Sequence, residues 1–190
     1  MKLNKAKLPT KYGSAYIYWF SDVLHNKEHC CLVFWELDNK DNVLCRIHSS
    51  CITWDVFQSL KCDCGEQLDF ALKEISKNDG ILIYLNQEGR DIGLINKIQA
   101  YALQDEWYDT VEANEKLNLP IDNRDYQIVK EILDQLKVKS IKLMTNNPHK
   151  INQLENYWIK INEIIPIVVN SNIHNVNYLS TKKEKMKHYL

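Results

Sequence analysis

Glycine is scarce in this chain: five of the 190 residues are glycine, where an average usage of about 7% predicts roughly 13. There is no internal repeat and no low-complexity linker, so we expect one compact unit. No apolar run approaches the roughly 18 residues of a membrane-spanning helix, and the N-terminus lacks the apolar segment of a secretory signal. The net charge of −1 gives no basic field for nucleic acid or a membrane. These absences predict a cytoplasmic protein that binds neither.

Segments with strand character are concentrated in the first 50 residues. Three of them, at 14–20, 31–37 and 43–48, are rich in β-branched and aromatic residues and predict an N-terminal β-meander. Beyond residue 54, helices with apolar residues at i, i+3, i+4 and i+7 alternate with short apolar strands. The expected helices are 66–78, 93–105, 123–137, one capped by Asn147 with Pro148 at its first position, and a basic C-terminal helix; the expected strands are 81–85, 140–145 and 164–169.

This alternation predicts an α/β fold with a mixed, partly parallel sheet flanked by helices. The apolar content of 45% is enough for a core, so disorder is not expected. We expect residues 1–190 to form a single domain in which the N-terminal strands, about residues 1–50, pack on the α/β part. In the 93–105 helix the apolar stripe consists of Leu94, Ile98, Ala102 and Leu103.

The strongest metal signal is the C-x10-C-x-C pattern of Cys51, Cys62 and Cys64. Three thiolates suit zinc and leave a fourth position for water. On spacing alone, three buried or free cysteines explain the pattern equally well. His48 is a candidate fourth ligand, which would close the site and make it structural. Burial is favoured for the remaining cysteines, which lie in expected strands: Cys30, Cys31 and Cys45.

Two junctions between a strand and a helix carry groups that bind anions. Within 87–97, Gly89 and Gly93 allow close backbone approach, and Arg90 and the helix N-terminus favour negative charge. Within 145–150, Thr145, Lys150 and the N–H groups of a helix start have the same character, although plain capping accounts for them too. Two such junctions near a cysteine site indicate a phosphate-bearing small molecule beside a metal.

Two further features have simple structural explanations. The run of residues 122–125, with Asp122 and Arg124, predicts helix capping and a local ion pair. Tyr101 lies at the edge of its helical stripe and is typical of a core residue.

Taken together, the motifs resemble the GTP cyclohydrolase II family. The resemblance runs from AKLPT at residue 6 to KEKMKH near the end of the chain. It is carried in family order by RIHSSC, SLKCDCGEQL, QEGRDIGLINKIQAYALQ, YDTVEAN, DNRD and LMTNNPHK. Only the cyclohydrolase II part of the bifunctional riboflavin enzymes is expected here. The resemblance implies an enzyme that converts GTP to 2,5-diamino-6-ribosylamino-4(3H)-pyrimidinone 5′-phosphate, formate and pyrophosphate, the first step of riboflavin biosynthesis.

The resemblance also implies roles for individual residues. Cys51, Cys62 and Cys64 would hold one zinc ion per subunit, which activates water for attack on C8 of guanine. Tyr101 would assist at that ring, and Arg124 would act at the α-phosphate with Asp122 as its base; an electrostatic role for Arg124 is the alternative. A homodimer and Mg²⁺ bound with the triphosphate are expected. The implied contacts to GTP are Arg46, His48, Ser49, Gln67, Glu88, Gly89, Arg90, Thr110, Thr145 and Lys150.

The chain departs from the family pattern at several positions. Ser50 stands where the family usually has Glu. The tryptophans stand where relatives carry Gly, most clearly at Trp54 and Trp107; the complete set is Trp19, Trp35, Trp54, Trp107 and Trp158. One hypothesis is that the gene comes from a lineage that reads the codon UGA as glycine; the alternative is a divergent chain with genuine tryptophans. Because Ser50 and Trp54 flank Cys51, a zinc-stabilised nucleotide-binding module with little or no turnover is the competing function. A variant that stops at the formamidopyrimidine, and a non-catalytic subunit of a riboflavin assembly, are further alternatives.

Overall fold

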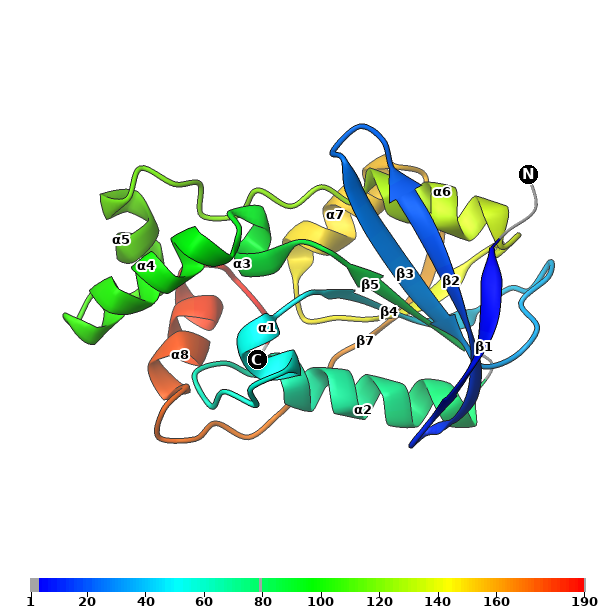
Figure 1. Ribbon diagram of the computed structural model, residues 1–190, viewed down its shortest axis with the longest axis horizontal. Helices are drawn as coiled ribbons and strands as arrows, with labels where there is room; N and C mark the ends of the chain where they lie inside the picture. The colour runs from blue at the N-terminus through cyan, green and yellow to red at the C-terminus, as the bar shows by residue number, and fades with distance from the viewer. Residues whose placement is uncertain (1–3, 79, 190) are drawn as a thin grey trace. The chain divides into compact units, whose positions relative to one another are not determined.

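The computed structural model describes residues 4–78 and 80–189 (Figure 1). The chain forms two compact units, each assembled from three segments of sequence. Unit 1 consists of Met1–His48, Leu68–Asn86 and Asp125–Ile167. Unit 2 consists of Ser49–Gln67, Gln87–Arg124 and Val168–Leu190.

Unit 1 is built on a seven-stranded sheet with the strand order β1-β2-β3-β5-β4-β6-β7. The first three strands form an antiparallel meander, and β5 pairs antiparallel with β3. At the other side of the sheet, β4, β6 and β7 run parallel. The prediction of a mixed, partly parallel sheet is therefore confirmed. The strands are β1 (Lys5–Thr10), β2 (Gly13–Asp22), β3 (Lys27–Val33), β4 (Val43–Ser49), β5 (Gly80–Leu85), β6 (Ile141–Met144) and β7 (Ile161–Ile165).

The meander is made of other strands than those that the sequence predicts. Its first strand is β1, which is mostly exposed at the sheet edge and has few of the β-branched and aromatic residues that mark a strand. The segment 43–48 forms β4, which lies between β5 and β6 instead of beside β3. Two strands also have other limits than the sequence predicts. β3 ends at Val33, and Trp35 lies beyond it in a bend with 54% of its surface exposed. β7 begins at Ile161 and is a largely exposed edge strand.

Helices cover both faces of the sheet in unit 1. The buried side chains of α6 and α7, including Ile132 and Leu154, belong to the main apolar core with the strands. Ala71 and Ile75 of α2 are also fully buried but lie outside that cluster, and α2 lies on the opposite side of the sheet (Figure 1). These helices are α2 (Cys64–Lys77, which begins in unit 2), α6 (Gln127–Gln135) and α7 (Pro148–Asn156).

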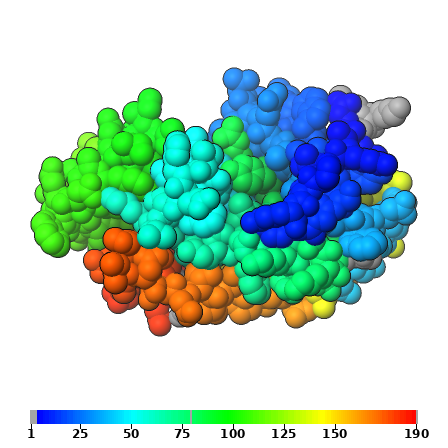
Figure 2. All heavy atoms as spheres, turned by 60° about the horizontal axis from the view of Figure 1, so that its bottom comes forward, coloured from blue at the N-terminus to red at the C-terminus, as the bar shows by residue number. Residues whose placement is uncertain are grey.

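The meander is also held to α2 by side chains. The phenol of Tyr12, in the turn between β1 and β2, donates to Oδ1 of Asp69 in α2 at 2.5 Å. Lys73 pairs with the other oxygen of Asp69 at 2.5 Å. Figure 2 shows this N-terminal hairpin in dark blue against the green of α2.

Unit 2 is helical, and its longest helix does not bury the stripe that the sequence predicts. In α4, Leu94 is 41% exposed and Ile98 is 48% exposed, whereas Lys97 and Ala100 are buried. The buried face of α4 is therefore the one that carries Lys97, and not the apolar stripe. None of the helices in the described part of the chain has the length and hydrophobicity needed to cross a membrane. The helices of unit 2 are α1 (Ile52–Asp55), α3 (Glu88–Asp91), α4 (Leu94–Asp105), α5 (Thr110–Lys116) and α8 (Val176–Glu184).

Two helix ends carry tryptophan where the backbone is left-handed. After α4, the N–H of Trp107 (φ 77°) donates to Gln104 and the next N–H to Leu103. After α7, the N–H of Trp158 (φ 59°) donates to Glu155 and the next N–H to Leu154. Both are Schellman motifs, in which this position is usually glycine. The two indole side chains are 96% and 89% exposed.

Candidate active site

Three cysteine sulfurs meet in unit 2. Cys51 is the N-cap residue of α1, Cys62 lies in the turn that follows, and Cys64 is the first residue of α2. Their Sγ atoms all lie within 4.8 Å of one another, and those of Cys51 and Cys62 are 3.8 Å apart. The fold thus brings together the three residues of the C-x10-C-x-C pattern, which we call the cysteine cluster.

The cysteine cluster fits a zinc ion in donor type and spacing. A tetrahedral ion with Zn–S bonds of about 2.3 Å separates its sulfurs by about 3.8 Å, which matches the separation of Cys51 and Cys62. Among the residues that the structure describes, the set of closely spaced metal-type donors contains these three cysteines and no histidine. Three protein ligands leave a fourth position for another ligand.

The three thiols differ in how readily they ionise. Hydrogen bonds from Cys62 and Cys64, together with the charge of Lys97, hold the pKa of Cys51 well below its ordinary value. The pKa of Cys62 is raised to about 12, and that of Cys64 is also raised, because each shares its proton with a neighbouring sulfur and is buried. Since only the thiolate ligates a metal, binding must release these protons and weaken as the pH falls.

A buried lysine lies directly against the cysteine cluster. Lys97 of α4 is 9% exposed, and its ammonium group donates to Cys51 Sγ at 3.2 Å, to Thr53 Oγ1 at 2.9 Å and to Glu88 Oε1 at 2.7 Å. Glu88 Oε2 accepts the N–H of Ile52 at 2.6 Å. Burial lowers the pKa of Lys97, but the negative charges around it outweigh burial and raise the pKa. Both oxygens of Glu88 are thus bonded to donors of the protein.

Tyr101, also on α4, faces the same group of residues. Its hydroxyl lies 3.4 Å from Thr53 Oγ1, and the ammonium group of Lys61 lies 5.0 Å from its ring centroid. Burial raises the pKa of Tyr101 to about 12. The phenol is therefore neutral at physiological pH and able to donate a hydrogen bond.

The residue between the last two cysteines anchors the C-terminal helix. Asp63 is fully buried, and its carboxylate accepts from Gln67 Nε2 at 2.6 Å and from Lys182 Nζ of α8 at 2.5 Å. Lys182 is itself 8% exposed. A buried ion pair of this kind fixes the loop that carries Cys62 and Cys64, because separating the charges leaves one of them uncompensated.

The 87–93 loop has an unusual backbone. Gly89, Arg90 and Asp91 have φ values of 61°, 58° and 71°, followed by Gly93 at 86°. A left-handed conformation costs an L-residue about 1–2 kcal/mol, and such residues cluster at ligand-binding segments. The carbonyl of Arg90 accepts the N–H of Asn123 at 3.0 Å, which ties this loop to the segment that carries Arg124.

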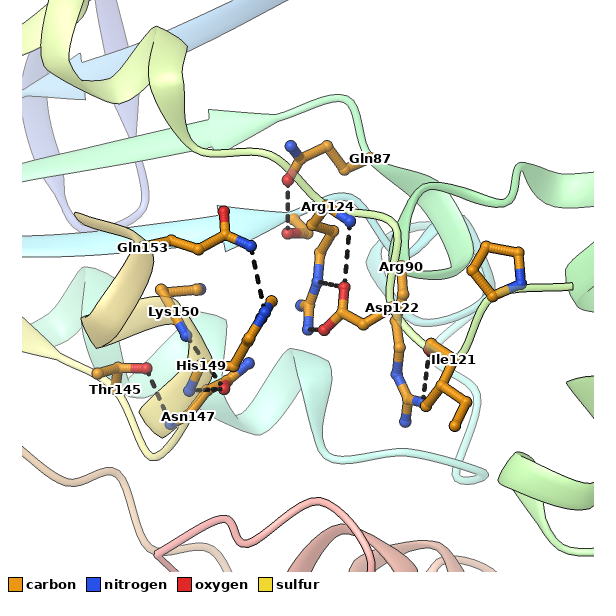
Figure 3. A network of polar contacts seen from close by, with 12 residues as sticks. Gln87, Arg90, Ile121, Asp122, Arg124, Thr145, Asn147, His149, Lys150 and Gln153 are labelled. Carbon is orange, nitrogen blue, oxygen red and sulfur yellow. Dashed lines mark hydrogen bonds and ion pairs between the residues drawn. The ribbon is translucent and has the colours of Figure 1, made fainter. Parts of the chain in front are cut away.

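Asp122 and Arg124 form the local ion pair that the sequence predicts (Figure 3). Arg124 Nε donates to Oδ1 of Asp122 at 2.8 Å, and Nη2 donates to Oδ2 at 2.5 Å. Burial raises the pKa of Asp122, but the hydrogen bonds and charge of Arg124 outweigh it and lower the pKa. The carboxylate is therefore a weak base. Nearby in unit 2, Arg90 Nη1 donates to the carbonyl of Ile121 at 3.3 Å.

A second group of the predicted residues lies in unit 1. Arg46, on β4, is 6% exposed and donates to the carbonyl of Met144 at 3.0 Å. Lys150 is 4% exposed and donates to the carbonyl of Ile47 at 2.7 Å. Asn147 caps α7 by accepting from His149 and Lys150, as the sequence predicts, and its own N–H bonds to Thr145 Oγ1 at 3.2 Å (Figure 3). The ring of His48 stacks on that of Tyr84 with centroids 5.7 Å apart.

Other predicted residues of unit 2 form hydrogen bonds within that unit. Ser49 Oγ donates to Gln87 Oε1 at 3.1 Å, and Ser50 Oγ accepts the N–H of Gln87 at 3.1 Å. Ser50 therefore ties the first cysteine segment to the 87–93 loop. Thr110 is the first residue of α5, after a capping box formed by Asp109.

Sequence patterns did not single out Lys97 or Lys182 as members of the site. A lysine within a helix is ordinarily on the solvent face, and the apolar stripe of α4 predicted the wrong face of this helix to be buried. A buried pair between residues 63 and 182 leaves no local signal, because the two are 119 positions apart.

Trp54 lies against the start of α2. A Cβ atom added to Gly65, which follows Cys64, would come within 1.7 Å of the Trp54 ring. The indole therefore fits only because residue 65 has no side chain.

Comparison with known proteins gives a consistent match over the chain. A family model described as GTP cyclohydrolase II matches residues 1–166. The GTP cyclohydrolase-2 of Buchnera aphidicola subsp. Schizaphis graminum (strain Sg) is 48% identical over 100% of this chain and 97% of its own length. That of Helicobacter acinonychis (strain Sheeba) is 49% identical over 98% of this chain and 96% of its own length.

A longer relative matches through about half of its length. The riboflavin biosynthesis protein RibBA of Endomicrobium trichonymphae is 49% identical over 96% of this chain and 46% of its own. Among solved structures, RibBX of A. baumannii, a two-domain 3,4-dihydroxy-2-butanone 4-phosphate synthase, covers 90% of this chain and 40% of that chain at 18% identity and a TM-score of 0.49.

Proposed function

The chain belongs to the GTP cyclohydrolase II family, and from this membership we propose that it is a hydrolase of riboflavin biosynthesis that opens the imidazole ring of GTP. The products are formate, pyrophosphate and 2,5-diamino-6-ribosylamino-4(3H)-pyrimidinone 5′-phosphate. The observation that carries the proposal is the cysteine cluster, because it supplies three thiols with the spacing of metal ligands within a chain that resembles these enzymes from end to end.

The metal that we assign to Cys51, Cys62 and Cys64 is zinc, one ion per subunit. When bound, zinc supplies Lewis acidity and an activated water for attack at C8 of guanine. Tyr101 lies on the helix that faces the cysteine cluster, and as a neutral phenol it donates a hydrogen bond to the developing charge on the ring. Lys61 beside its ring adds positive charge there.

At the phosphate end we assign Arg124 an electrostatic role. A guanidinium is almost always protonated, and Asp122 has a lowered pKa, which makes it a poor base for removing that proton. The two hydrogen bonds between them hold the guanidinium plane in a fixed orientation. A planar, oriented guanidinium stabilises the charge that develops on a phosphate under attack.

The remaining residues are proposed as contacts to GTP. Glu88 is an exception among the residues implied by resemblance, since its two oxygens already accept from Lys97 and Ile52, which favours a positioning role. Mg²⁺ is expected to accompany the triphosphate. The proposed contacts in unit 1 are Arg46, His48, Thr145 and Lys150, and those in unit 2 are Ser49, Gln67, Gly89, Arg90 and Thr110.

We also propose a homodimer in the cytoplasm, as the family resemblance implies. Sedimentation equilibrium of the purified protein tests the oligomeric state directly.

The activity is tested by incubating the protein with GTP, Mg²⁺ and Zn²⁺ and measuring formate and pyrophosphate separately. Equal release of both supports the proposed reaction. Pyrophosphate without formate identifies an enzyme that stops at the formamidopyrimidine, and GTP binding without either product identifies a nucleotide-binding module.

Two substitutions test the assigned roles. Cys62→Ser should abolish both zinc binding and formate release, and ring opening that survives the loss of zinc would contradict the metal's role. Tyr101→Phe should keep zinc and GTP binding but lower kcat by about 100-fold or more, because it removes a positioned proton donor. An unchanged kcat would exclude Tyr101 from the chemistry.

A further inference from the structure

A divalent metal ion bound by the three thiolates of the cysteine cluster would leave an excess negative charge, and one positively charged side chain lies against the cluster. Three thiolates around a divalent ion carry one negative charge in excess, and two of the three cysteines, Cys51 and Cys62, are buried, where an uncompensated charge is costly. Lys97 is the buried cation that touches the cluster, through a hydrogen bond of 3.2 Å to Cys51 Sγ. Its positive charge is shared with the carboxylate of Glu88, 2.7 Å away, and offsets part of the excess.

We propose that Lys97 is a positioning residue of the metal centre, which holds the Cys51 thiolate by a hydrogen bond and keeps the bound metal electron-poor. This inference rests on the proposed zinc site. Three thiolates donate much electron density to a metal and so reduce its Lewis acidity. A hydrogen bond from an ammonium group withdraws part of that density from the sulfur, since bonds to ionised partners are the strong ones.

The surroundings of Lys97 fix the direction of this hydrogen bond. An ammonium group has three N–H donors, and three acceptors surround it: Glu88 Oε1, Thr53 Oγ1 and Cys51 Sγ. Glu88 is itself held by the N–H groups of Ile52 and Gly89. The third donor is therefore directed at sulfur by a rigid set of partners.

The orientation of α4 agrees with this role. The helix leaves Leu94, Ile95 and Ile98 exposed and buries Lys97. Burying a lysine in preference to three large apolar side chains is unfavourable unless the ammonium group gains strong partners. The helix is thus oriented by the polar contacts of Lys97, which places Tyr101 one turn further along the same face.

The test compares Lys97→Met, which removes the charge but keeps the apolar stem, with the unmodified protein. Lys97→Gln is a second neutral replacement in case the methionine variant does not fold. Lys97→Arg retains the charge, and Lys116→Met is the matched control, because Lys116 is exposed on α5 of the same unit and bonds to Tyr108. Circular dichroism establishes that each variant is folded.

Two measurements that do not depend on turnover are made on these proteins. The zinc dissociation constant is obtained by competition with a chromophoric chelator, and the neutral variants should bind zinc about 10–100-fold more weakly. In the cobalt-substituted protein, the sulfur-to-cobalt charge-transfer band should move to longer wavelength in the neutral variants, because a sulfur without the hydrogen bond is a better electron donor. Lys97→Arg should lie between them and the unmodified protein, and Lys116→Met should match the unmodified protein.

The outcomes separate this inference from the zinc site itself. If the unmodified protein binds neither zinc nor cobalt at the cysteines, the proposed metal centre is wrong, and the role of Lys97 is wrong with it. If it binds both and the folded neutral variants show the same affinity and the same band, the zinc site stands and the role of Lys97 is overturned. A loss of thermal stability alone, with affinity and band unchanged, assigns Lys97 a purely structural role and overturns the proposal.

Discussion

At the residue scale, Trp107 and Trp158 occupy a backbone conformation that glycine adopts without strain. Both follow a helix, both donate the hydrogen bonds of a Schellman motif, and both leave the indole almost fully exposed. Neither side chain therefore gains burial that offsets its backbone strain. At both helix ends the tryptophan therefore costs backbone strain in a motif that is otherwise normal.

We predict that Trp107→Gly and Trp158→Gly each stabilise the protein by about 1 kcal/mol, the cost of left-handed backbone in an L-residue. The free energy of unfolding from urea denaturation measures the effect. Trp19→Gly is the contrasting control: Trp19 lies within β2, where glycine weakens the strand. Destabilisation by all three substitutions would contradict the expectation.

These two positions bear on the hypothesis that UGA encodes glycine in the source lineage. Gly is the residue that both helix ends favour, whereas Trp19 and Trp35 have no positive φ. The hypothesis predicts glycine at all five tryptophan positions in protein purified from the native organism. Intact-mass analysis of that protein tests it, and tryptophan at every position would refute it.

At the element scale, α8 lies beyond residue 166, where the match to the family model ends. It is nevertheless joined to the loop that carries two residues of the cysteine cluster, because Lys182 reaches the fully buried Asp63 between Cys62 and Cys64. The helix is therefore part of the support of the cysteine cluster.

We predict that Lys182→Met destabilises the protein by about 3–5 kcal/mol, because it leaves the carboxylate of Asp63 buried without its charge partner. Adding Asp63→Asn should recover much of this loss, since the amide needs no counter-charge. Guanidinium denaturation of the two variants measures both steps. Equal stability of the single and double variants would show that the pair does not interact as the distances indicate.

At the scale of the whole molecule, we expect the C-terminal segment to make stability depend on pH. The Nε2 atom of His188 is buried, and burial together with the charges of Lys182, Arg124 and Arg90 lowers the pKa of His188 to about 3. The unfolded chain binds this proton near the ordinary value of 6.5. Between these values the unfolded state holds more protons, so stability is complete above about pH 6.5 and declines as the pH falls towards 3.

We predict that His188→Asn flattens this decline. The free energy of unfolding measured from pH 7 to pH 4 should fall less steeply in the variant than in the unmodified protein. His174→Asn is the matched control, because His174 is exposed in the segment before α8. The same slope in all three proteins would exclude His188 as the source of the pH dependence.

Local sequence signals were sufficient where structure depends on neighbouring residues. The apolar spacing of α2 and α6, the Asn147–Pro148 start of α7 and the Asp122–Arg124 pair all follow from interactions within a few positions. The same signals missed α5, which lacks a strong apolar period, and β1, which has few β-branched and aromatic residues, and misjudged the limits of β3 and β7, where apolar residues continue into exposed turns or edges.

By itself, the sequence determined the family, the α/β class and the three cysteines of the cysteine cluster, because each depends on residue type and spacing along the chain. Only the tertiary structure decided that β4 lies between β5 and β6, that α4 buries Lys97 in place of its apolar stripe, and that Asp63 pairs with Lys182. These outcomes depend on which distant segments share a desolvated environment, where one buried charge determines the partner it must have. The spacing of residues along the chain does not indicate that environment.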